Sequence, residues 1–164
     1  MTKAVIFDLD GTLINLPIDY DRLFQELGKI MKTKEVRPIT TTVAKLDEKT
    51  KKKAFEVWES IELDAFEKMA VNDEGMDLYR RFSDKPKALV TMQGITLTQN
   101  VFESLGLSFD SVITREDSLN RREQLELAAK KTGKTLRDTL FVGNTDEDAH
   151  AAEEAGCRFL KVGE

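Results

Sequence analysis

The feature that most constrains the fold of this chain is a short apolar run near its start that ends in two carboxylates. Residues 4–7 are Ala-Val-Ile-Phe, and Asp8, Leu9, Asp10 and Gly11 follow. A continuous apolar run is typical of a strand buried on both faces, as in a parallel sheet. Carboxylates this close together repel one another and resist burial, so packing alone does not explain them. Because open α/β sheets bind ligands at the carboxyl ends of their strands, Asp8 is the first candidate for chemistry.

The second half of the chain alternates short apolar runs with helical patterns. Capping residues and terminal glycines predict helices between these runs, opened by Thr98, by Asn120 and near Asp146. Strands that alternate with helices over short connections form a parallel sheet with helices on both faces, so the predicted fold class is α/β. The further strands are expected at residues 88–91, 111–114, 139–142 and 158–162.

The stretch between the first strand and residue 84 is predicted to be helical. Asp19 or Asp21 can cap a helix that runs to about Met31, and a longer helical region with an apolar stripe follows. No strand pattern is recognised between residues 14 and 87. We therefore predict a core made of residues 1–14 and 84–164, with a small helical insertion at residues 15–83.

Charge and composition narrow the class of partner. The net charge of −5 argues against a general binder of nucleic acid or of anionic membranes, because both need basic surface. No apolar run approaches the length of a transmembrane helix, and the first residues lack the pattern of a signal peptide. The single cysteine, Cys157, excludes an internal disulfide and fits a reducing compartment. We expect a cytoplasmic protein that binds neither nucleic acid nor membrane, and the sequence sets no oligomeric state.

Polar residues end three of the predicted strands. Asp8 and Asp10 end the first, Thr91 ends the second, and Asn144 follows the strand at 139–142. Parallel strands share a direction, so these residues are expected along one edge of the sheet. Asp148, four residues after Asn144, can turn back to the same edge from the first turn of its helix.

Two arginines stand where a helix disfavours them. Arg121 and Arg122 lie at a predicted helix start, whose dipole repels cations, so another reason should place them there. The whole set fits phosphoryl transfer, in which one carboxylate attacks phosphorus, a second carboxylic acid protonates the leaving oxygen, and a hydroxyl and a guanidinium hold the phosphoryl oxygens. A carboxylate and a phosphate charge ~4 Å apart repel by about 1 kcal/mol in water and about 4 kcal/mol in a partly screened site. A hard cation is therefore expected, and Mg²⁺ suits oxygen ligands.

The order and context of these motifs resemble those of the haloacid dehalogenase (HAD) superfamily. The likeness runs over essentially the whole chain and includes residues 8–13 (Asp-Leu-Asp-Gly-Thr-Leu), Thr91 and residues 143–148 (Gly-Asn-Thr-Asp-Glu-Asp). The helical insertion and residues 111–117 (Ser-Val-Ile-Thr-Arg-Glu-Asp) are similar to the phosphoglycolate phosphatase and β-phosphoglucomutase branch. The resemblance implies a Rossmann-like sheet in which the first strand lies beside the strand that ends at Gly143. It also implies that the insertion is a cap that closes over the site and selects the substrate.

The same resemblance implies a role for each catalytic residue. Asp8 would be the nucleophile that forms an aspartyl-phosphate, with its other oxygen on Mg²⁺. Asp10 would be the general acid and then the base that activates water, and its backbone carbonyl would bind the metal. Thr91 and the backbone N–H of Met92 would bind the phosphoryl group. Arg121, with Arg122 as the alternative, occupies the place of the usual lysine and keeps its charge.

One metal position departs from the family pattern. Asn144 stands where the family usually has an aspartate; its amide oxygen can still coordinate Mg²⁺, but the site loses one negative charge. The predicted metal ligands are Asp8, Asp10, Asn144 and Asp148. For Asp148 three routes stay open: direct binding, binding through water, or orientation of Arg121.

The function predicted from the sequence is a Mg²⁺-dependent phosphatase of small phosphorylated metabolites. A phosphomutase is the first alternative, and it requires that the phosphate on Asp8 survive until it returns to substrate. A weakly active or non-catalytic protein that binds a phosphorylated ligand or a partner protein is the second, and Asn144 motivates it. Dehalogenation is disfavoured, because that chemistry uses neither Asp10 nor a metal. The substrate would be set by cap residues that the sequence does not single out.

Overall fold

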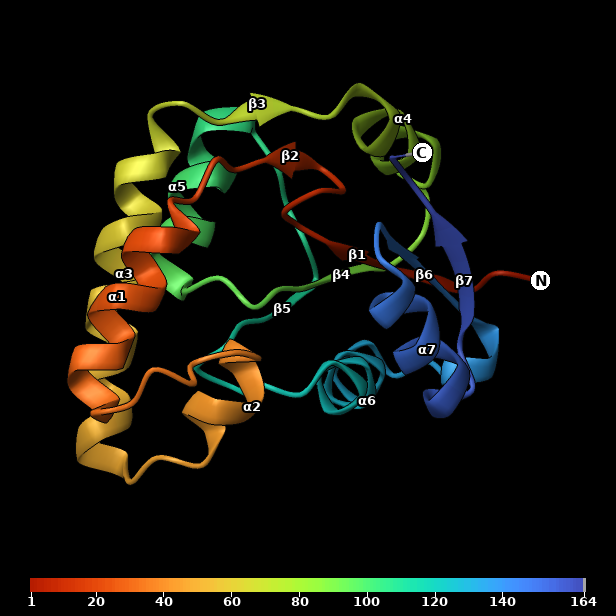
Figure 1. Ribbon diagram of the computed structural model, residues 1–164. Coiled ribbons are helices and arrows are strands. Elements are labelled where there is room, and N and C mark those ends of the chain that lie inside the picture. Colours follow the sequence, from red (N-terminus) through yellow and green to blue (C-terminus); the bar gives the residue numbers. More distant parts are fainter. Residues whose placement is uncertain (164) are drawn as a thin grey trace.

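A five-stranded parallel sheet organises the structure, a computed structural model in which residues 1–163 are described (Figure 1). The strands lie in the order β5-β4-β1-β6-β7, and every neighbouring pair is parallel. Strand β1 lies between β4 and β6, as the resemblance implies, and the predicted α/β class is confirmed. The strands are β1 (Ala4–Asp8), β4 (Lys87–Val90), β5 (Ser111–Ile113), β6 (Thr139–Gly143) and β7 (Arg158–Lys161), and a 3₁₀ turn, η1 (Leu136–Asp138), precedes β6.

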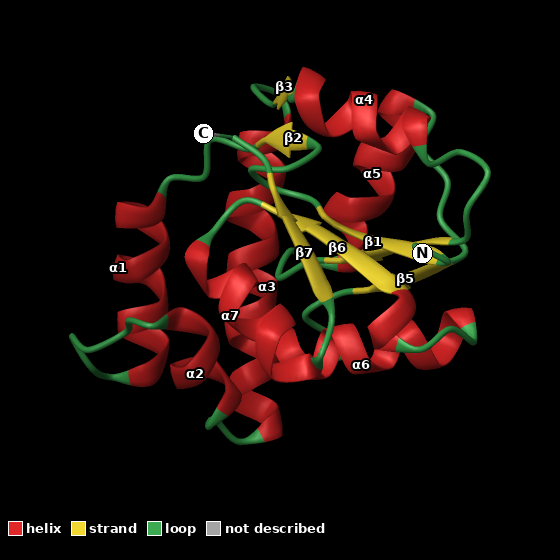
Figure 2. Cartoon of the chain, turned by 90° about the vertical axis from the view of Figure 1, so that its right-hand side faces the viewer, coloured by secondary structure: helices red, strands yellow, loops and turns green. Residues whose placement is uncertain are grey.

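Helices cover both faces of the sheet (Figure 2). The side chains of β1 are buried and alternate between the faces, because successive residues of a strand point to opposite sides. Ile6 packs in the cluster beneath α6 and α7, whereas Phe7 packs in the larger cluster on the side of α4 and α5. The covering helices are α4 (Asp73–Arg81), α5 (Ile95–Leu105), α6 (Arg121–Thr132) and α7 (Asp146–Ala155).

Local sequence explains where the last two helices begin and end. The side chain of Asn120 accepts a hydrogen bond from the backbone N–H of Glu123 at the start of α6, and Gly133 ends the helix in the left-handed conformation. Helix α7 opens with a capping box between Thr145 and Asp148. The predicted bounds of both helices are confirmed.

The predicted start of α5 was wrong. The helix begins at Ile95 with Gly94 as its N-cap, and Thr98 lies within the first turn. The hydroxyl of Thr98 donates to the carbonyl of Gly94 at 2.8 Å, so it satisfies a bond inside the helix. Gly94 has no side chain with which to cap the helix, so no capping residue in the sequence marks this start.

The insertion forms a helical cap joined to the sheet by a short two-stranded ribbon. Strands β2 (Ile14–Asn15) and β3 (Ala70–Val71) pair antiparallel where the cap begins and ends. The prediction that no strand lies between residues 14 and 87 was wrong, because strands of two residues are too short to show an alternating pattern. The cap helices are α1 (Tyr20–Met31), α2 (Ile39–Ala44) and α3 (Glu48–Phe66), and they lie together on one side of the sheet, away from the N-terminus (Figure 1).

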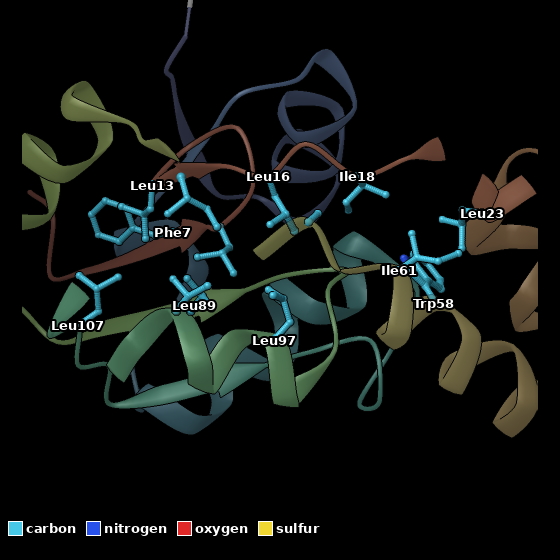
Figure 3. Packing of buried hydrophobic residues seen from close by; sticks show 14 of the residues in the cluster. Phe7, Leu13, Leu16, Ile18, Leu23, Trp58, Ile61, Leu89, Leu97 and Leu107 are labelled. Atoms are coloured by element: carbon cyan, nitrogen blue, oxygen red, sulfur yellow. The ribbon is translucent and has the colours of Figure 1, made fainter. Parts of the chain in front are cut away.

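Helix α4 packs on the sheet, although the sequence grouped it with the insertion. The ring of Tyr79 meets that of Phe7 edge-on at 6.1 Å between centroids and that of Phe109 at 5.5 Å. One hydrophobic cluster then continues from these residues past Leu97 to Trp58 in the cap (Figure 3). Cap and core are therefore joined by a shared apolar layer. No helix among residues 1–163 is both long and apolar enough to cross a membrane.

Candidate active site

The residues predicted for the site gather at the carboxyl edge of the sheet, around a cavity of about 480 Å³ that we call the catalytic cavity. The ends of β1, β4 and β6 lie side by side there, because the three strands are neighbours and parallel. From the core, the cavity is lined by Asp8, Asp10, Met92, Arg121, Asn144 and Asp148; from the cap, by Tyr20, Thr40 and Thr41. Thr91 is buried behind this wall, and its hydroxyl accepts a hydrogen bond from the N–H of Gln93 at 3.1 Å.

Arg121 bridges the two acidic residues at the base of the cavity. Its Nη2 donates to Asp8 Oδ1 at 3.1 Å and its Nε donates to Asp148 Oδ1 at 3.1 Å. Its Nη1 donates to Gln124 Oε1 at 2.7 Å, which holds the guanidinium from the helix side. The carboxylates of Asp8 and Asp148 offset the repulsion between the Arg121 guanidinium and the positive end of the helix dipole at the start of α6. Arg122 instead forms a surface pair with Glu126 at 3.6 Å, so the fold brings Arg121 alone of the two to Asp8.

Asp148 is held in place through both of its carboxylate oxygens. Oδ2 accepts from the backbone N–H groups of Asn144 at 3.2 Å and Thr145 at 3.4 Å, and Oδ1 accepts from Arg121. Gly143 leaves room for this turn, because a Cβ there would lie 2.8 Å from Asp148 Oδ2. Three roles were left open for Asp148: binding the metal directly, binding it through water, or orienting Arg121. These contacts are those expected for a residue that orients Arg121.

Asn144 packs against the loop that follows the first strand. Its Oδ1 lies 3.5 Å from the Thr12 hydroxyl, which donates to it. Gly11 has a φ of +85°, and a Cβ at this residue would lie 2.1 Å from Asn144 Nδ2. Only glycine therefore allows the loop to turn this close to the amide.

Burial changes the acidity of both carboxylates of the first motif. Desolvation raises the pKa of Asp8 to about 7, with the charge of Arg121 opposing the rise and that of Asp148 adding to it. Desolvation also raises the pKa of Asp10, against hydrogen bonds from the N–H groups of Leu16 and Gly11. The N–H of Leu16 donates to Asp10 Oδ1 at 2.8 Å, so the side chain has a defined position. A raised pKa favours the protonated form of Asp10, which is the form that a general acid needs.

The oxygen donors at the cavity fit Mg²⁺ when a phosphate and water complete its shell. Among residues 1–163 there is no cluster of three or more His, Cys, Asp or Glu side chains that could hold a metal ion. Both oxygens of Asp148 already accept hydrogen bonds, so the donors left on the cavity wall belong to Asp8, Asp10 and Asn144, of which Asp8 Oδ1 also accepts from Arg121 and Asn144 Oδ1 from Thr12. Mg²⁺ commonly keeps several waters and binds one or two carboxylates together with substrate phosphate, so this small donor set is of the right kind.

Sequence reasoning missed a buried ion pair that contacts the loop after β4. Arg115 Nη1 donates to Glu62 Oε2 at 2.6 Å, and both side chains are 0% exposed. The guanidinium lies 4.3 Å from the centroid of a ring of Trp58. Glu62 Oε1 accepts from the N–H of Gly94 at 3.2 Å, and Arg115 donates to the carbonyl of Met92 at 3.2 Å.

This pair joins cap helix α3 to the two loops that follow β4 and β5. The only hints in the sequence are an acid within the apolar stripe of α3 and an arginine directly after a strand. Tyr20 was missed as well, and no local signal marks it. It lines the catalytic cavity, and its partial burial together with the charges of Asp10, Glu62 and Asp8 raises its pKa to about 12.

Comparison with known proteins identifies solved structures that have a similar fold. No protein-family model and no curated protein sequence matches the chain. Among solved structures, a haloacid dehalogenase-like family hydrolase from Streptococcus pneumoniae is 19% identical with a TM-score of 0.70, over 98% of this chain and 84% of that one. A candidate phosphoglycolate phosphatase from Lactobacillus plantarum is 18% identical with a TM-score of 0.68, over 97% and 86% of the two chains. A HAD family enzyme from Bacteroides thetaiotaomicron, solved in complex with magnesium and inorganic phosphate, is 15% identical with a TM-score of 0.60, over 98% and 94%. The chain has the fold of the HAD hydrolases, which confirms the resemblance at the level of the fold.

Proposed function

We propose that this chain, whose fold is that of the HAD hydrolases, is a Mg²⁺-dependent phosphatase of small phosphorylated metabolites that works through an aspartyl-phosphate. The observation that carries the proposal is the setting of Asp8. This carboxylate ends β1 on the wall of the catalytic cavity, within 3.1 Å of the Arg121 guanidinium, and Asp10 lines the same cavity. A nucleophile, a proton donor and a cation that can balance phosphate charge are thus available to one small ligand.

The first half of the reaction forms the phospho-enzyme. A carboxylate oxygen of Asp8 attacks phosphorus, the bond to the leaving oxygen breaks, and Asp10 donates its proton to that oxygen. Arg121 then faces a phosphoryl group in place of a free carboxylate, and the N–H of Met92, on the cavity wall, donates to a phosphoryl oxygen. Mg²⁺ held by Asp8 and Asn144 would supply positive charge that lowers the repulsion between carboxylate and phosphate.

The second half releases phosphate. Asp10, now ionised, takes a proton from a water molecule that attacks phosphorus, and the bond between phosphorus and the Asp8 oxygen breaks. Inorganic phosphate leaves, and Asp10 again carries the proton that the next cycle needs. A phosphomutase on the same scaffold would instead return the phosphoryl group from Asp8 to substrate.

The substitution Asp8→Asn tests the nucleophile. Release of phosphate from 4-nitrophenyl phosphate in the presence of Mg²⁺ should fall by at least about 10³-fold, because an essential nucleophile acts in every turnover. The matched control is Asp84→Asn, which removes an exposed carboxylate that does not line the catalytic cavity. Unchanged phosphate release by Asp8→Asn would refute the proposal, and a long-lived phospho-enzyme that passes phosphate back to substrate would favour the mutase.

A protein that binds a phosphorylated ligand without turning it over is the second candidate. Asn144 favours it, because the amide provides no charge for the metal, and Arg121 already neutralises Asp8 in part. Turnover measured over a Mg²⁺ titration separates the two. If the unmodified protein shows no Mg²⁺-dependent turnover with any substrate, and Asn144→Asp shows some, the binding protein is supported.

A further inference from the structure

The catalytic cavity continues into a second cavity between cap and core, which we call the aromatic pocket. Its volume is about 580 Å³, and it is lined by Tyr20, Phe24, Arg37, Trp58, Met92 and Gln93, among others. Tyr20, Met92 and Gln93 line both cavities. An ester whose phosphoryl group reaches Asp8 can therefore place its leaving group against the aromatic side chains of the cap.

The pocket presents ring faces and apolar side chains from two cap helices. The rings of Tyr20 and Phe24 lie 6.0 Å apart at a tilt of 35° on the first turns of α1, and Trp58 comes from α3. Tyr20 is 45% exposed, although it stands beside the catalytic cavity, so its ring is open to a ligand. Aromatic side chains arranged in this way favour a flat, unsaturated ligand, which gains stacking contacts in addition to apolar burial.

Arg37 adds an unused positive charge to this wall. Its guanidinium lies 5.3 Å from the centroid of the Phe24 ring. None of the ion pairs found among residues 1–163 includes Arg37. Among the described residues that line the pocket, Arg37 is the only cation and Glu147 the only carboxylate, and the two form no ion pair. A free guanidinium over an aromatic ring is a good partner for a carboxylate or a phosphate.

A third cavity also opens beside the catalytic one, and its charge makes it the poorer place for an anion. It has a volume of about 570 Å³ and shares Thr40, Thr41, Leu119 and Asn120 with the catalytic cavity. Its lining carries four carboxylates, from Glu48, Glu116, Asp117 and Glu123. Of the cations in its lining, Arg115 pairs with Glu62, Lys51 lies 3.7 Å from Glu48, and Lys45 forms no ion pair among the described residues, so carboxylates outnumber cations there.

We infer that the aromatic pocket binds the leaving group of the substrate, and that this group is planar and carries a second negative charge. The inference rests on the proposed function, since it takes the phosphoryl group to lie at Asp8. The rings of Tyr20 and Phe24 recognise the flat part of the leaving group, and Arg37 recognises its anion. The substrate class is thus a phosphomonoester of a planar, anionic alcohol or phenol.

The test compares two esters of nearly equal shape, 4-carboxyphenyl phosphate and 4-carbamoylphenyl phosphate. The unmodified protein should have a kcat/KM about five-fold higher for the carboxylate than for the amide, as expected for one partly exposed ion pair. In Arg37→Gln this ratio should fall about five-fold relative to the unmodified protein, with the amide ester unaffected. Because the ratio is compared between proteins, the different reactivities of the two leaving groups cancel.

Arg81→Gln is the matched control, because Arg81 is exposed on α4 and lines none of the three cavities. It should leave the ratio unchanged. An equal loss with both esters in Arg37→Gln, or no change in the ratio, would overturn the inference. Tyr20→Leu should weaken binding of both esters by about three-fold, through loss of the ring contact.

Binding measured without turnover separates the failure of the inference from failure of the proposed function. Calorimetric titration of Asp8→Asn should show the same five-fold preference for the carboxylate, and adding Arg37→Gln to it should remove this preference. A protein that binds with this preference but hydrolyses neither ester would refute the phosphatase and support the pocket. A protein that hydrolyses both esters with no effect of Arg37→Gln would support the phosphatase and refute the pocket.

Discussion

The buried pair of Glu62 and Arg115 gives a direct measure of how firmly the cap is fixed to the core. The substitution Glu62→Gln keeps the shape of the side chain and its acceptor for the Gly94 N–H, but removes the charge that balances the guanidinium. Both side chains are 0% exposed, so water cannot take over the lost interaction. Breaking a buried pair by removing one partner costs about 3–5 kcal/mol. A change of 1 kcal/mol shifts the melting temperature of a domain of about this size by about 2–4 °C, so a fall of about 6–20 °C is expected.

Thermal unfolding followed by circular dichroism at neutral pH measures this effect. The matched control is Asp64→Asn, which breaks the pair of Arg22 and Asp64 on the surface of the same cap. That pair is as short, 2.6 Å, but its side chains are 46% and 64% exposed. An exposed pair contributes about 0–1 kcal/mol, so the control should lower the melting temperature by at most about 4 °C. If Glu62→Gln lowers the melting temperature no more than Asp64→Asn does, burial does not make this ion pair more important for stability than the exposed one.

A double variant distinguishes the lost charge from lost packing. In Glu62→Leu with Arg115→Met, no charge is left without its partner, and apolar side chains fill similar space beside Trp58. The melting temperature should recover part of the loss seen in Glu62→Gln, because apolar replacement of a buried pair is often neutral or stabilising. A double variant less stable than Glu62→Gln would show that hydrogen bonds to the two loops matter more than the charge balance.

Three further predictions concern the catalytic cavity. The pKa of Asp8 rises from 3.8 to about 7 on folding, so between these pH values the folded protein holds a proton that the unfolded chain releases, and stability falls as the pH rises. Asp8→Asn should therefore raise the melting temperature more at pH 8 than at pH 5 in Mg²⁺-free buffer. Equal increases at the two pH values would contradict this. Asn144→Asp should bind Mg²⁺ about ten-fold more tightly by calorimetry without substrate, since it adds a carboxylate to the donor set, and unchanged affinity would remove Asn144 from that set. Gly11→Ala should lower the melting temperature by more than Gly106→Ala: both residues have positive φ, +85° and +68°, but only at Gly11 would the new Cβ collide, 2.1 Å from Asn144 Nδ2. If both glycine variants lower the melting temperature equally, the Asn144 side chain can move away from the new Cβ at little cost in free energy.

The parts of the fold that the sequence predicted are those set by local chemistry. An apolar run that ends in carboxylates marks β1, and the capping side chain of Asn120 and the terminal glycines Gly133 and Gly156 mark bounds of α6 and α7. Each signal depends on residues within one turn or one strand, so it can be recognised without knowledge of the neighbours. The expectation that Asp8 and Asn144 would meet followed from the rule that parallel strands end at one edge.

The features that the sequence did not predict depend on contacts between segments that are far apart in the chain. Arg121 and Arg122 are adjacent in sequence and equal in charge, yet the rotation of α6 turns one to Asp8 and leaves the other on the surface. The pair of Glu62 and Arg115 joins residues 53 positions apart, and a charged residue in an apolar stripe does not identify its partner.

The sequence by itself therefore determined the parallel α/β sheet and the edge on which the acidic residues collect, because apolar runs and capping residues are local signals; the order of the strands came from the structure. Only the tertiary structure decided which arginine meets Asp8, how the cap is held, and that Tyr20, Phe24 and Arg37 form one wall beside the catalytic cavity. Those outcomes depend on how helices rotate and pack against a sheet, and that is settled by the sum of many weak contacts spread along the whole chain.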